Sequence, residues 1–240
     1  MATVQRQTIF LRAEWANLIM LNYAVDAALL ESFVPPGTQL DEFNGKTYVS
    51  LVGFEFNRSR VLGVRIPFHQ SFEEVNLRFY VKRSSRRGVV FVRELVPKYA
   101  VATIARIAFG ENYSRVAMSR HAETLVGDDL RVEYRWGRRE QCCSMQIETE
   151  GAAFLPPDGS DSQFITEHYW GYAVQPDGSC LEYEVQHPRW RVRRAKRAVL
   201  SGSLAPFYGV DFAKTLSRTP DSAFLAEGSD VAIMKGSRII

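Results

Sequence analysis

Cysteine and lysine are both scarce in this chain of 240 residues. The three cysteines form no CxxC pair, and two of them, Cys142 and Cys143, are adjacent. The set therefore has neither the spacing of a disulfide framework nor that of a zinc site. A small, odd number of cysteines without a motif is typical of a reducing compartment, and we expect a cytoplasmic protein. Lysine occurs six times, against 24 arginines.

Long apolar runs and strongly basic segments are missing as well. No run of apolar residues approaches the length of about 18 that a transmembrane helix needs. Charged and amide side chains interrupt residues 1–30, which therefore lack the apolar centre of a signal peptide. The net charge of +3 is far below that of a typical nucleic-acid-binding domain. We therefore expect neither a membrane nor a nucleic-acid partner.

The overall composition is that of an ordinary globular protein, with 46% apolar and 24% charged residues. No repeat, low-complexity block or linker divides the chain. Folding can bury roughly 70% of the surface of an unfolded chain of this length, so the core needs no disulfides. The sequence predicts a single domain over residues 1–240.

Most of the regular patterns predict β-strands. Segments rich in Val, Ile, Tyr and Phe lie at residues 47–56, 72–81, 88–96, 99–109, 130–136 and 180–193. Short helices are predicted at residues 27–34 after Asp26, 162–170 after Asp161, and 206–216, which begins with a proline. Adjacent strands with short connections, including a hydrophilic hairpin at residues 82–88, favour a mainly β (α+β) fold. We expect a single antiparallel, barrel-like sheet with a few short helices.

One predicted strand, residues 72–81, carries an unusual set of polar side chains on one face. The two-residue alternation of a strand places these together: Glu74, Asn76, Arg78 and Tyr80. A strand with one face in water explains such a pattern. However, these four residue types combine hydrogen-bond donors and acceptors, as the lining of a polar cavity would.

A second candidate feature is a lone charge in an apolar segment. Arg106 is the only charged residue of residues 99–109, which resemble a strand buried on both faces. A buried, unpaired charge costs several kcal/mol, so Arg106 is expected to meet a carboxylate or a bound anion. Glu74 and Glu94 are the available carboxylates, and alternation places Glu94 on the face of three valines of its strand. A structural salt bridge and a ligand-facing cluster both remain open.

Several segments together resemble a known family. They are ARIAFGENYSRVAM at residues 105–118, NYAVD at 22–26, VPPGTQLDEFNGKTYVSLVGFEF at 34–56 and EHYWGY at 167–172. In their order and spacing they resemble the uncharacterised YqjF-like proteins, which share the acetoacetate-decarboxylase-like fold. The resemblance covers most of the chain. It implies one mainly antiparallel barrel with a central cavity.

The resemblance to true acetoacetate decarboxylases is incomplete at the reacting residue. Those enzymes carry an Arg-Glu-x-x-Gly-aromatic-Pro-Lys-Lys segment, whose first lysine forms a Schiff base with the keto acid. In this chain Arg106 and Gly110 match, Ile107 stands in place of the glutamate, and Tyr113 and Ser114 replace the two lysines. A phenol with a pKa near 10 forms no imine, so the resemblance does not carry that mechanism over. Glu74 resembles the carboxylate that the decarboxylases place on an early barrel strand.

Motifs for metals, nucleotides and hydrolytic catalysis are absent from the sequence. Its four histidines are dispersed, without HxH or HExxH, and there is no GxSxG, GxGxxG or P-loop pattern. We expect no metal and no cofactor, with a metal site assembled through space as the alternative. Among the histidines, His168 joins the candidate site because it lies between residues of the EHYWGY segment.

A basic run at residues 189–197 offers the best argument for nucleic acid, with six basic residues in nine. Alternation places Trp190 and Val192 on one face of this segment and its first three arginines on the other. An edge strand with a solvated arginine face explains the pattern. Phosphate binding is the alternative.

These observations support three hypotheses. The first is a module that binds a small anionic organic molecule in the barrel cavity, with Arg106 and Arg78 as charge partners. The second is an enzyme, a lyase or another acid/base catalyst acting on an organic acid without a Schiff-base lysine. In it Glu74 or Glu94 moves a proton and Tyr113 donates to a developing oxyanion. The third is a nucleic-acid-binding or structural protein.

A homo-oligomer is compatible with all three hypotheses, with Trp136 and Trp190 as candidate interface residues. The candidate site comprises Glu74, Asn76, Arg78, Tyr80, Glu94, Arg106, Tyr113 and His168.

Overall fold

A computed structural model describes residues 8–65, 70–98, 109–138 and 141–239 of the chain. The first half runs through strands β1 (Ile9–Val25), β2 (Gln39–Leu40), β3 (Thr47–Val61), β4 (Val64–Arg65), β5 (Phe72–Arg83), β6 (Arg86–Val96), β7 (Tyr113–Arg115) and β8 (Met118–Thr124). The second half contains β9 (Leu130–Trp136), β10 (Cys143–Phe154), β11 (Trp170–Val174), β12 (Cys180–Gln186), β13 (Val192–Gly202), β14 (Ser222–Met234) and β15 (Ser237–Ile239). The helices are α2 (Asp161–Thr166), α3 (Ala205–Tyr208) and α4 (Val210–Leu216), with 3-10 turns at Ala27–Leu29 and Glu31–Phe33.

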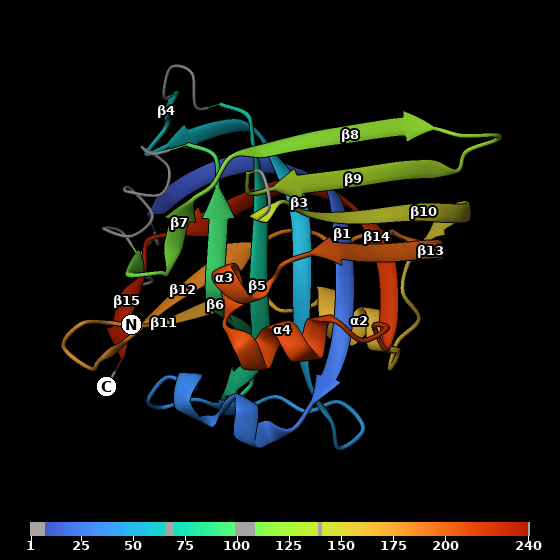
Figure 1. Cartoon of the computed structure of the whole chain (residues 1–240). Coiled ribbons are helices and arrows are strands. Elements are labelled where there is room, and N and C mark those ends of the chain that lie inside the picture. Colours follow the sequence, from blue (N-terminus) through green and yellow to red (C-terminus); the bar gives the residue numbers. More distant parts are fainter. Residues whose placement is uncertain (1–7, 66–69, 99–108, 139–140, 240) are drawn as a thin grey trace.

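The central strands close into a ring. They are hydrogen-bonded in the order β12-β11-β6-β5-β3-β1-β14, and β14 pairs in turn with β12. Most of these pairings are antiparallel, but β11 runs parallel to β6, as does β7. From β14 the sheet continues through β13, β10, β9 and β8, which extend beyond the ring on one side (Figure 1). The barrel-like, mainly antiparallel sheet expected from the sequence is confirmed, in the form of a ring with an extension.

Local irregularities let the long strands bend around this ring. The pairing of β1 with β3 shifts between Ala16 and Ile19, around Asn17, which has a φ of 54°. Asparagine tolerates this left-handed conformation better than most residues, and a bulge of this kind bends a strand and increases its twist. Bends of this kind allow one strand of seventeen residues to follow the curvature of the ring.

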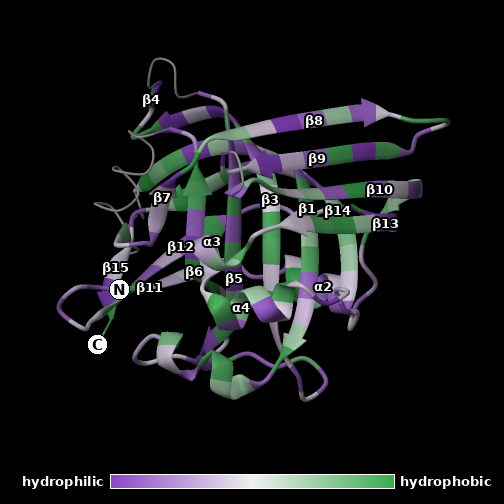
Figure 2. Cartoon of the chain, in the orientation of Figure 1, coloured by the Kyte–Doolittle hydropathy of each residue, from purple (hydrophilic) through white to green (hydrophobic). Residues whose placement is uncertain are grey.

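The two faces of the ring strands pack into different cores. Side chains such as Leu51, Leu77 and Phe79 pack outward against β9, β10, α3 and α4, which cover that face (Figure 1). The opposite face forms a second core that is rich in aromatic side chains, including Phe54 and Phe56. In Figure 2 the central strand β3 is mostly hydrophobic, whereas β8 and β9 carry strongly hydrophilic bands. The inner face of the ring is therefore buried rather than exposed to solvent.

Three of the sequence-based element boundaries need correction. Residues 27–34 form two 3-10 turns instead of a helix, although Asp26 accepts a hydrogen bond from the Ala28 amide as a cap would. The helix expected at 162–170 ends at Thr166, and Ser160 rather than Asp161 is its N-cap. The third predicted helix is divided into α3 and α4 by Gly209, which has a φ of 83°.

The prediction that the basic run, residues 189–197, forms an edge strand was also wrong. Its strand is interrupted, because β12 ends at Gln186 and β13 begins at Val192. β13 pairs with both β10 and β14, so it is not an edge strand. Trp136 and Trp190, which the sequence suggested as interface residues, are 1% and 3% exposed and belong to the core. Within the described ranges, no helix is long and apolar enough to cross a membrane.

Candidate functional site

The inner face of the ring encloses a cavity of about 100 Å³. A buried water needs roughly 10–15 Å³ by the same measure, so the space suits a small organic molecule of several heavy atoms. β1, β3, β5, β6, β12 and β14 all contribute lining side chains, as do β7, β11 and α2. Much of the wall is aromatic, with contributions from Trp15, Phe54, Phe56, Phe72, Phe91 and Trp190.

The polar face of β5 points into this cavity. Glu74, Asn76 and Arg78 line it and are only 2%, 2% and 8% exposed. The alternate residues Val75, Leu77 and their successors pack into the outer core. Three of the four polar residues of this face thus line a cavity and are buried from solvent.

Glu94 reaches the same cavity through an irregularity in β6. The pairing of β5 with β6 shifts between Leu77 and Arg78, leaving one extra residue in β6. As a result Val90 and Val92 pack into the outer core, whereas Glu94 lines the cavity directly opposite Asn76. The expectation that Glu94 shares a face with these two valines was wrong, because strict alternation does not hold across a β-bulge.

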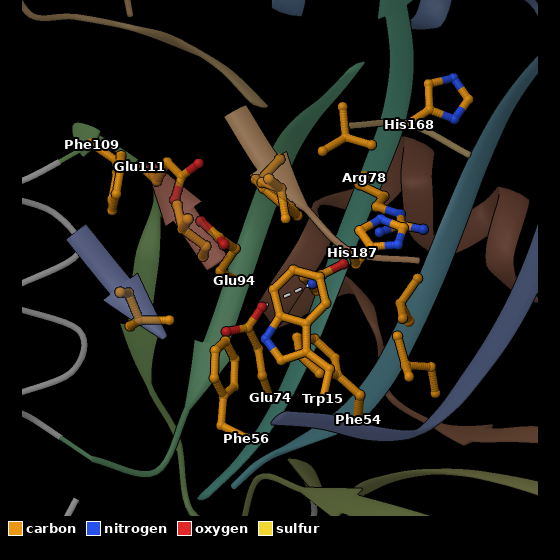
Figure 3. A pocket seen from close by; sticks show the side chains of 18 of the residues that line it. Trp15, Phe54, Phe56, Glu74, Arg78, Glu94, Phe109, Glu111, His168 and His187 are labelled. Atoms are coloured by element: carbon orange, nitrogen blue, oxygen red, sulfur yellow. Dashed lines mark hydrogen bonds between the residues drawn. The ribbon is translucent and has the colours of Figure 1, made fainter. Parts of the chain in front are cut away.

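Three buried glutamates, Glu74, Glu94 and Glu111, form what we call the carboxyl cluster (Figure 3). Two tyrosines border it: Tyr113 on β7 donates to Glu74 at 3.3 Å, and the Tyr183 hydroxyl on β12 donates a short hydrogen bond to Glu111. Tyr113 thus lies beside Glu74. All six lysines fall in the described residues, and none lines the cavity.

Glu111 and Tyr183 were not among the residues singled out from the sequence. Glu111 stands in the GENYS stretch two residues before Tyr113, so the family-like segment itself carried a signal for it. Tyr183 shares a face of β12 with Leu181 and Val185, and only the closure of the ring brings this face to the glutamates. No local sequence pattern could have indicated the contact between Tyr183 and Glu111.

Burial governs the protonation of the carboxyl cluster. It raises the pKa of Glu74 to about 8 and that of Glu111 to about 7, and the charge of Glu111 adds to the shift at Glu74. The pKa of Glu94 is raised well above its ordinary range, by burial first and then by the charges of Glu111 and Glu74. The pKa of the Tyr113 hydroxyl is raised well above 10 for the same reasons. At neutral pH the cluster therefore retains protons that exposed glutamates would lose.

Arg78 lies across the cavity from Glu94 and Glu111, beside His187 (Figure 3). Its Nη2 reaches the Ile165 carbonyl only at 3.5 Å, and its guanidinium lies 5.8 Å from the centre of the Tyr80 ring. Arg78 forms no ion pair with any residue of the described ranges, and its Nε has no hydrogen-bond acceptor there. Arg78 is therefore a buried positive charge that no carboxylate of the described residues contacts directly, although the charge of Glu74 acts on it.

Polar contacts hold the His168 side chain in place. Its Nε2 lies 3.3 Å from Asp41, which also accepts a hydrogen bond from Arg87 at 2.6 Å. Burial lowers the pKa of His168 to about 4 despite this carboxylate, and that of His187 is also lowered to about 4, mainly by burial. Both rings are therefore neutral at neutral pH. For Asp41, burial opposes ionisation, but the bonds from His168 and Arg87 lower its pKa.

Two predicted site residues remain, Tyr80 and Arg106. Tyr80 does not line the cavity; its ring packs on His168 at 4.5 Å, and its hydroxyl lies 2.5 Å from the Ser50 Oγ. Arg106 lies outside the described residues, as does most of the predicted strand 99–109, so its role stays a prediction. Searching the described residues reveals no group of three His, Cys, Asp or Glu side chains that could hold a metal.

Comparison with known proteins agrees with this architecture. The model of the DUF2071 family, described as uncharacterized conserved proteins, matches residues 12–230. The uncharacterized protein YqjF of Bacillus subtilis (strain 168) is 26% identical over 204 residues, which cover 83% of this chain and 82% of that protein. The YqjF-like resemblance inferred from the sequence is thereby confirmed.

Solved structures show the same fold at low sequence identity. Acetoacetate decarboxylase from Legionella pneumophila superimposes with a TM-score of 0.68 at 11% identity, covering 100% of this chain and 92% of the other. The enduracididine biosynthesis enzyme MppR complexed with pyruvate gives 0.67 at 12% identity, with coverages of 99% and 93%. An acetoacetate decarboxylase-like enzyme from Sphingomonas wittichii RW1 gives 0.66 at 13% identity, with coverages of 96% and 93%. These similarities show an acetoacetate-decarboxylase-like fold.

Proposed function

Because the chain belongs to the DUF2071 family of uncharacterized conserved proteins and has an acetoacetate-decarboxylase-like fold, we propose that it binds a small anionic organic molecule in the cavity of the ring. The observation that carries the proposal is Arg78, which is 8% exposed and has no ion pair among the described residues. Burying a charge without a partner costs several kcal/mol, so a bound anion would compensate the charge of Arg78.

The chemistry of arginine suits this role. Its guanidinium is always charged at physiological pH and offers two parallel N–H groups to a carboxylate. The Nε of Arg78 is buried and has no acceptor among the described residues, so its N–H group lacks a partner that a carboxylate could supply. Around it the cavity is mostly aromatic and aliphatic, which strengthens an ionic hydrogen bond by excluding water. MppR, which has this fold, is complexed with pyruvate, a small organic anion, and this supports the same class of ligand here. Arg106 remains the second predicted charge partner.

An acid/base enzyme on the same site is the second candidate, favoured by the protonated carboxyl cluster. Burial keeps Glu74 protonated near neutral pH, and Tyr113 is hydrogen-bonded to it, so both could donate a proton or a hydrogen bond to a bound organic acid. Such a reaction would proceed without a lysine imine, since none of the six lysines lines the cavity. Incubating a bound acid with the protein and following its NMR spectrum separates the two candidates, because only an enzyme changes the ligand.

Replacing Arg78 by methionine tests the anion site. We expect small carboxylates to raise the melting temperature of the wild-type protein by about 5–10 °C at a concentration near 100 Kd. The Arg78→Met variant should lose this shift, while its own stability is unchanged or higher, because an uncompensated buried charge is replaced by an apolar side chain of similar length. The measurement is a thermal shift titration across a panel of acids from acetate to pentanoate.

Arg60→Met is the matched control for this experiment. Arg60 lies on β3, is exposed and does not line the cavity, so the control variant should keep the full ligand-induced shift. The proposal fails if no acid of the panel stabilises the wild-type protein. It also fails if Arg78→Met responds to the acids as the wild type does.

A further inference from the structure

We propose that the carboxyl cluster binds a protonated amine, so that the ligand is a zwitterion whose carboxylate meets Arg78 and whose ammonium group meets Glu94. This inference rests on the proposed anion site at Arg78 and adds a second, oppositely charged end to the ligand. It is carried by the hydrogen-bonding atoms that the folded chain leaves unused inside the cavity.

The unused atoms near the cluster include two acceptors, and Trp15 Nε1 is an unused donor beside Glu74. Glu94 Oε2 and Asn76 Oδ1 are buried and have no hydrogen-bond partner within the described residues. The two residues are 1% and 2% exposed and lie directly opposite each other on β6 and β5. Buried polar groups are almost always satisfied, so these two unsatisfied atoms on cavity-lining residues favour a ligand that brings N–H donors and ionises Glu94 when it binds. An ammonium group has three of them.

The unused group at the other end of the cavity is a donor. Arg78 Nε has no acceptor in the described ranges, and the guanidinium has no counter-ion there. Asn76 and Arg78 are two residues apart on the same face of β5, a spacing of about 7 Å along a strand. The backbone positions of the unused acceptor on Asn76 and the unused donor on Arg78 are therefore separated by about the length of a short carbon chain.

The cavity wall between the two ends also fits an ammonium group and a methylene chain. No salt bridge to Glu74, Glu94 or Glu111 forms within the described residues, and the one cationic side chain whose charge acts on Glu74 is Arg78, which makes no direct contact with it. Trp15, Phe54 and Phe56 lie along the cavity beside Glu74 (Figure 3). Aromatic faces attract cations and pack against methylene groups. Burial and mutual repulsion keep protons on the carboxyl cluster, and a bound ammonium group would offset both effects.

Matched pairs of ligands test this inference. The pairs are acetate and glycine, propanoate and 3-aminopropanoate, butyrate and 4-aminobutyrate, and pentanoate and 5-aminopentanoate; butylamine tests the amine alone. By isothermal titration calorimetry at pH 7, we expect at least one aminated acid to bind about tenfold or more tightly than its partner. Binding of that ligand should release protons from the cluster, measured in two buffers of different ionisation enthalpy. The groups that face this ammonium site are Glu74, Glu94, Glu111, Tyr113, Tyr183 and Arg78.

Variants separate the two ends of the ligand. Glu94→Gln should remove most of the preference for the aminated acid and leave the affinity for the plain carboxylate within about twofold. Glu73→Gln is the matched control, since Glu73 is the neighbouring glutamate of β5 and does not line the cavity. Arg78→Met should weaken both acids and leave butylamine unaffected. Melting temperatures of the unliganded variants confirm that each is folded.

The outcomes distinguish this inference from the function on which it rests. If the plain acids bind in an Arg78-dependent manner but no aminated acid binds more tightly than its partner, the ammonium site is wrong and the anion site stands. If butylamine binds in a Glu94-dependent manner and no acid binds, the anion site is wrong, and the zwitterion is wrong with it. The comparison of ligand pairs on the wild-type protein decides the question even if Glu94→Gln fails to fold.

Discussion

At the scale of single residues, the carboxyl cluster links protonation to stability. Burial raises the pKa values of Glu74 and Glu111 to about 8 and about 7, whereas ordinary glutamates titrate near 4.5. The folded state therefore holds protons that the unfolded state releases, and the free energy of unfolding falls as pH rises through this range. His168 and His187 act in the opposite sense, but their pKa values of about 4 against an ordinary 6.5 confine that effect to lower pH. The contribution of the glutamates should therefore be clearest above pH 6.5.

We predict that the wild-type protein loses about 4 kcal/mol of unfolding free energy between pH 6.5 and 8, and that Glu94→Gln loses about half as much. The substitution removes one titrating group and also its repulsion of Glu74. Urea denaturation across this pH range measures both slopes. Glu73→Gln should keep the wild-type slope, and equal slopes for Glu94→Gln and the wild type would contradict the assignment.

The sequence indicated some site residues and missed others for physical reasons. Glu74, Asn76 and Arg78 could be predicted together because a regular strand alternates its side chains. Glu94 was chosen as a candidate but assigned to the wrong face, since the bulge in β6 leaves no clear mark in the sequence. Glu111 and Tyr183 meet only because the fold brings β12 next to the segment that precedes β7, and such a contact between distant segments has no local signal.

At the scale of elements, the pairing of β11 with β12 sets the position of Tyr183. Gly171 lies directly opposite Tyr183, and a Cβ atom at Gly171 would lie 2.1 Å from the ring of that tyrosine. The close approach allows the tyrosine to lie over the strand and donate to Glu111. A glycine in a strand interior often marks a place where another group approaches the backbone closely.

Gly171→Ala should therefore destabilise the protein by about 1–3 kcal/mol, because overpacking forces the Tyr183 ring to move. The displaced hydroxyl would no longer hold Glu111, so binding of the aminated acid should weaken as well. Urea denaturation of Gly171→Ala, Tyr183→Ala and the double variant gives the coupling energy. We expect the double variant to be more stable than the sum of the single changes implies; additive losses would show that the two residues do not clash.

The sequence patterns recovered short, regular strands better than long, bent ones. β3, β5, β6 and β9 were predicted close to their observed positions, because their apolar and polar residues alternate or form compact β-branched runs. β1 was missed because its outer half carries charged and amide residues and a bulge at Asn17. β14 was missed for a similar reason: Gly228, with a φ of 84°, interrupts it where it passes Trp15. Long strands that turn corners break the period on which prediction depends.

At the scale of the whole molecule, ring closure is what turns a set of strands into a site. The contact of β12 with β14 brings the wall that carries Tyr183 opposite β5 and β6, so that both polar ends share one cavity. The overall fold could be anticipated from the strand-rich composition and the family resemblance, whereas the cavity depends on which distant strands meet. The prediction of a single domain over residues 1–240 is compatible with this ring but is not tested by it.

The arginine-rich composition also takes on meaning at this scale. Within the basic run, Arg189 pairs with Asp158 and Glu167, and Arg193 pairs with Glu227. These ion pairs join β13 and its entry to neighbouring segments, a use of arginine that requires no nucleic acid. The absence of a nucleic-acid partner stays a prediction, as does a homo-oligomer. Arg78 stands apart from these arginines because it is buried and pairs with no carboxylate in the described part of the chain.

A crystal structure of the protein with the acid of the panel that binds most tightly tests the central claim most directly. The account predicts electron density for the ligand inside the ring, with its carboxylate oxygens at about 3 Å from the guanidinium nitrogens of Arg78. A ligand bound outside the ring, or one whose carboxylate points away from Arg78 while only water or an apolar group lies beside the guanidinium, would contradict it.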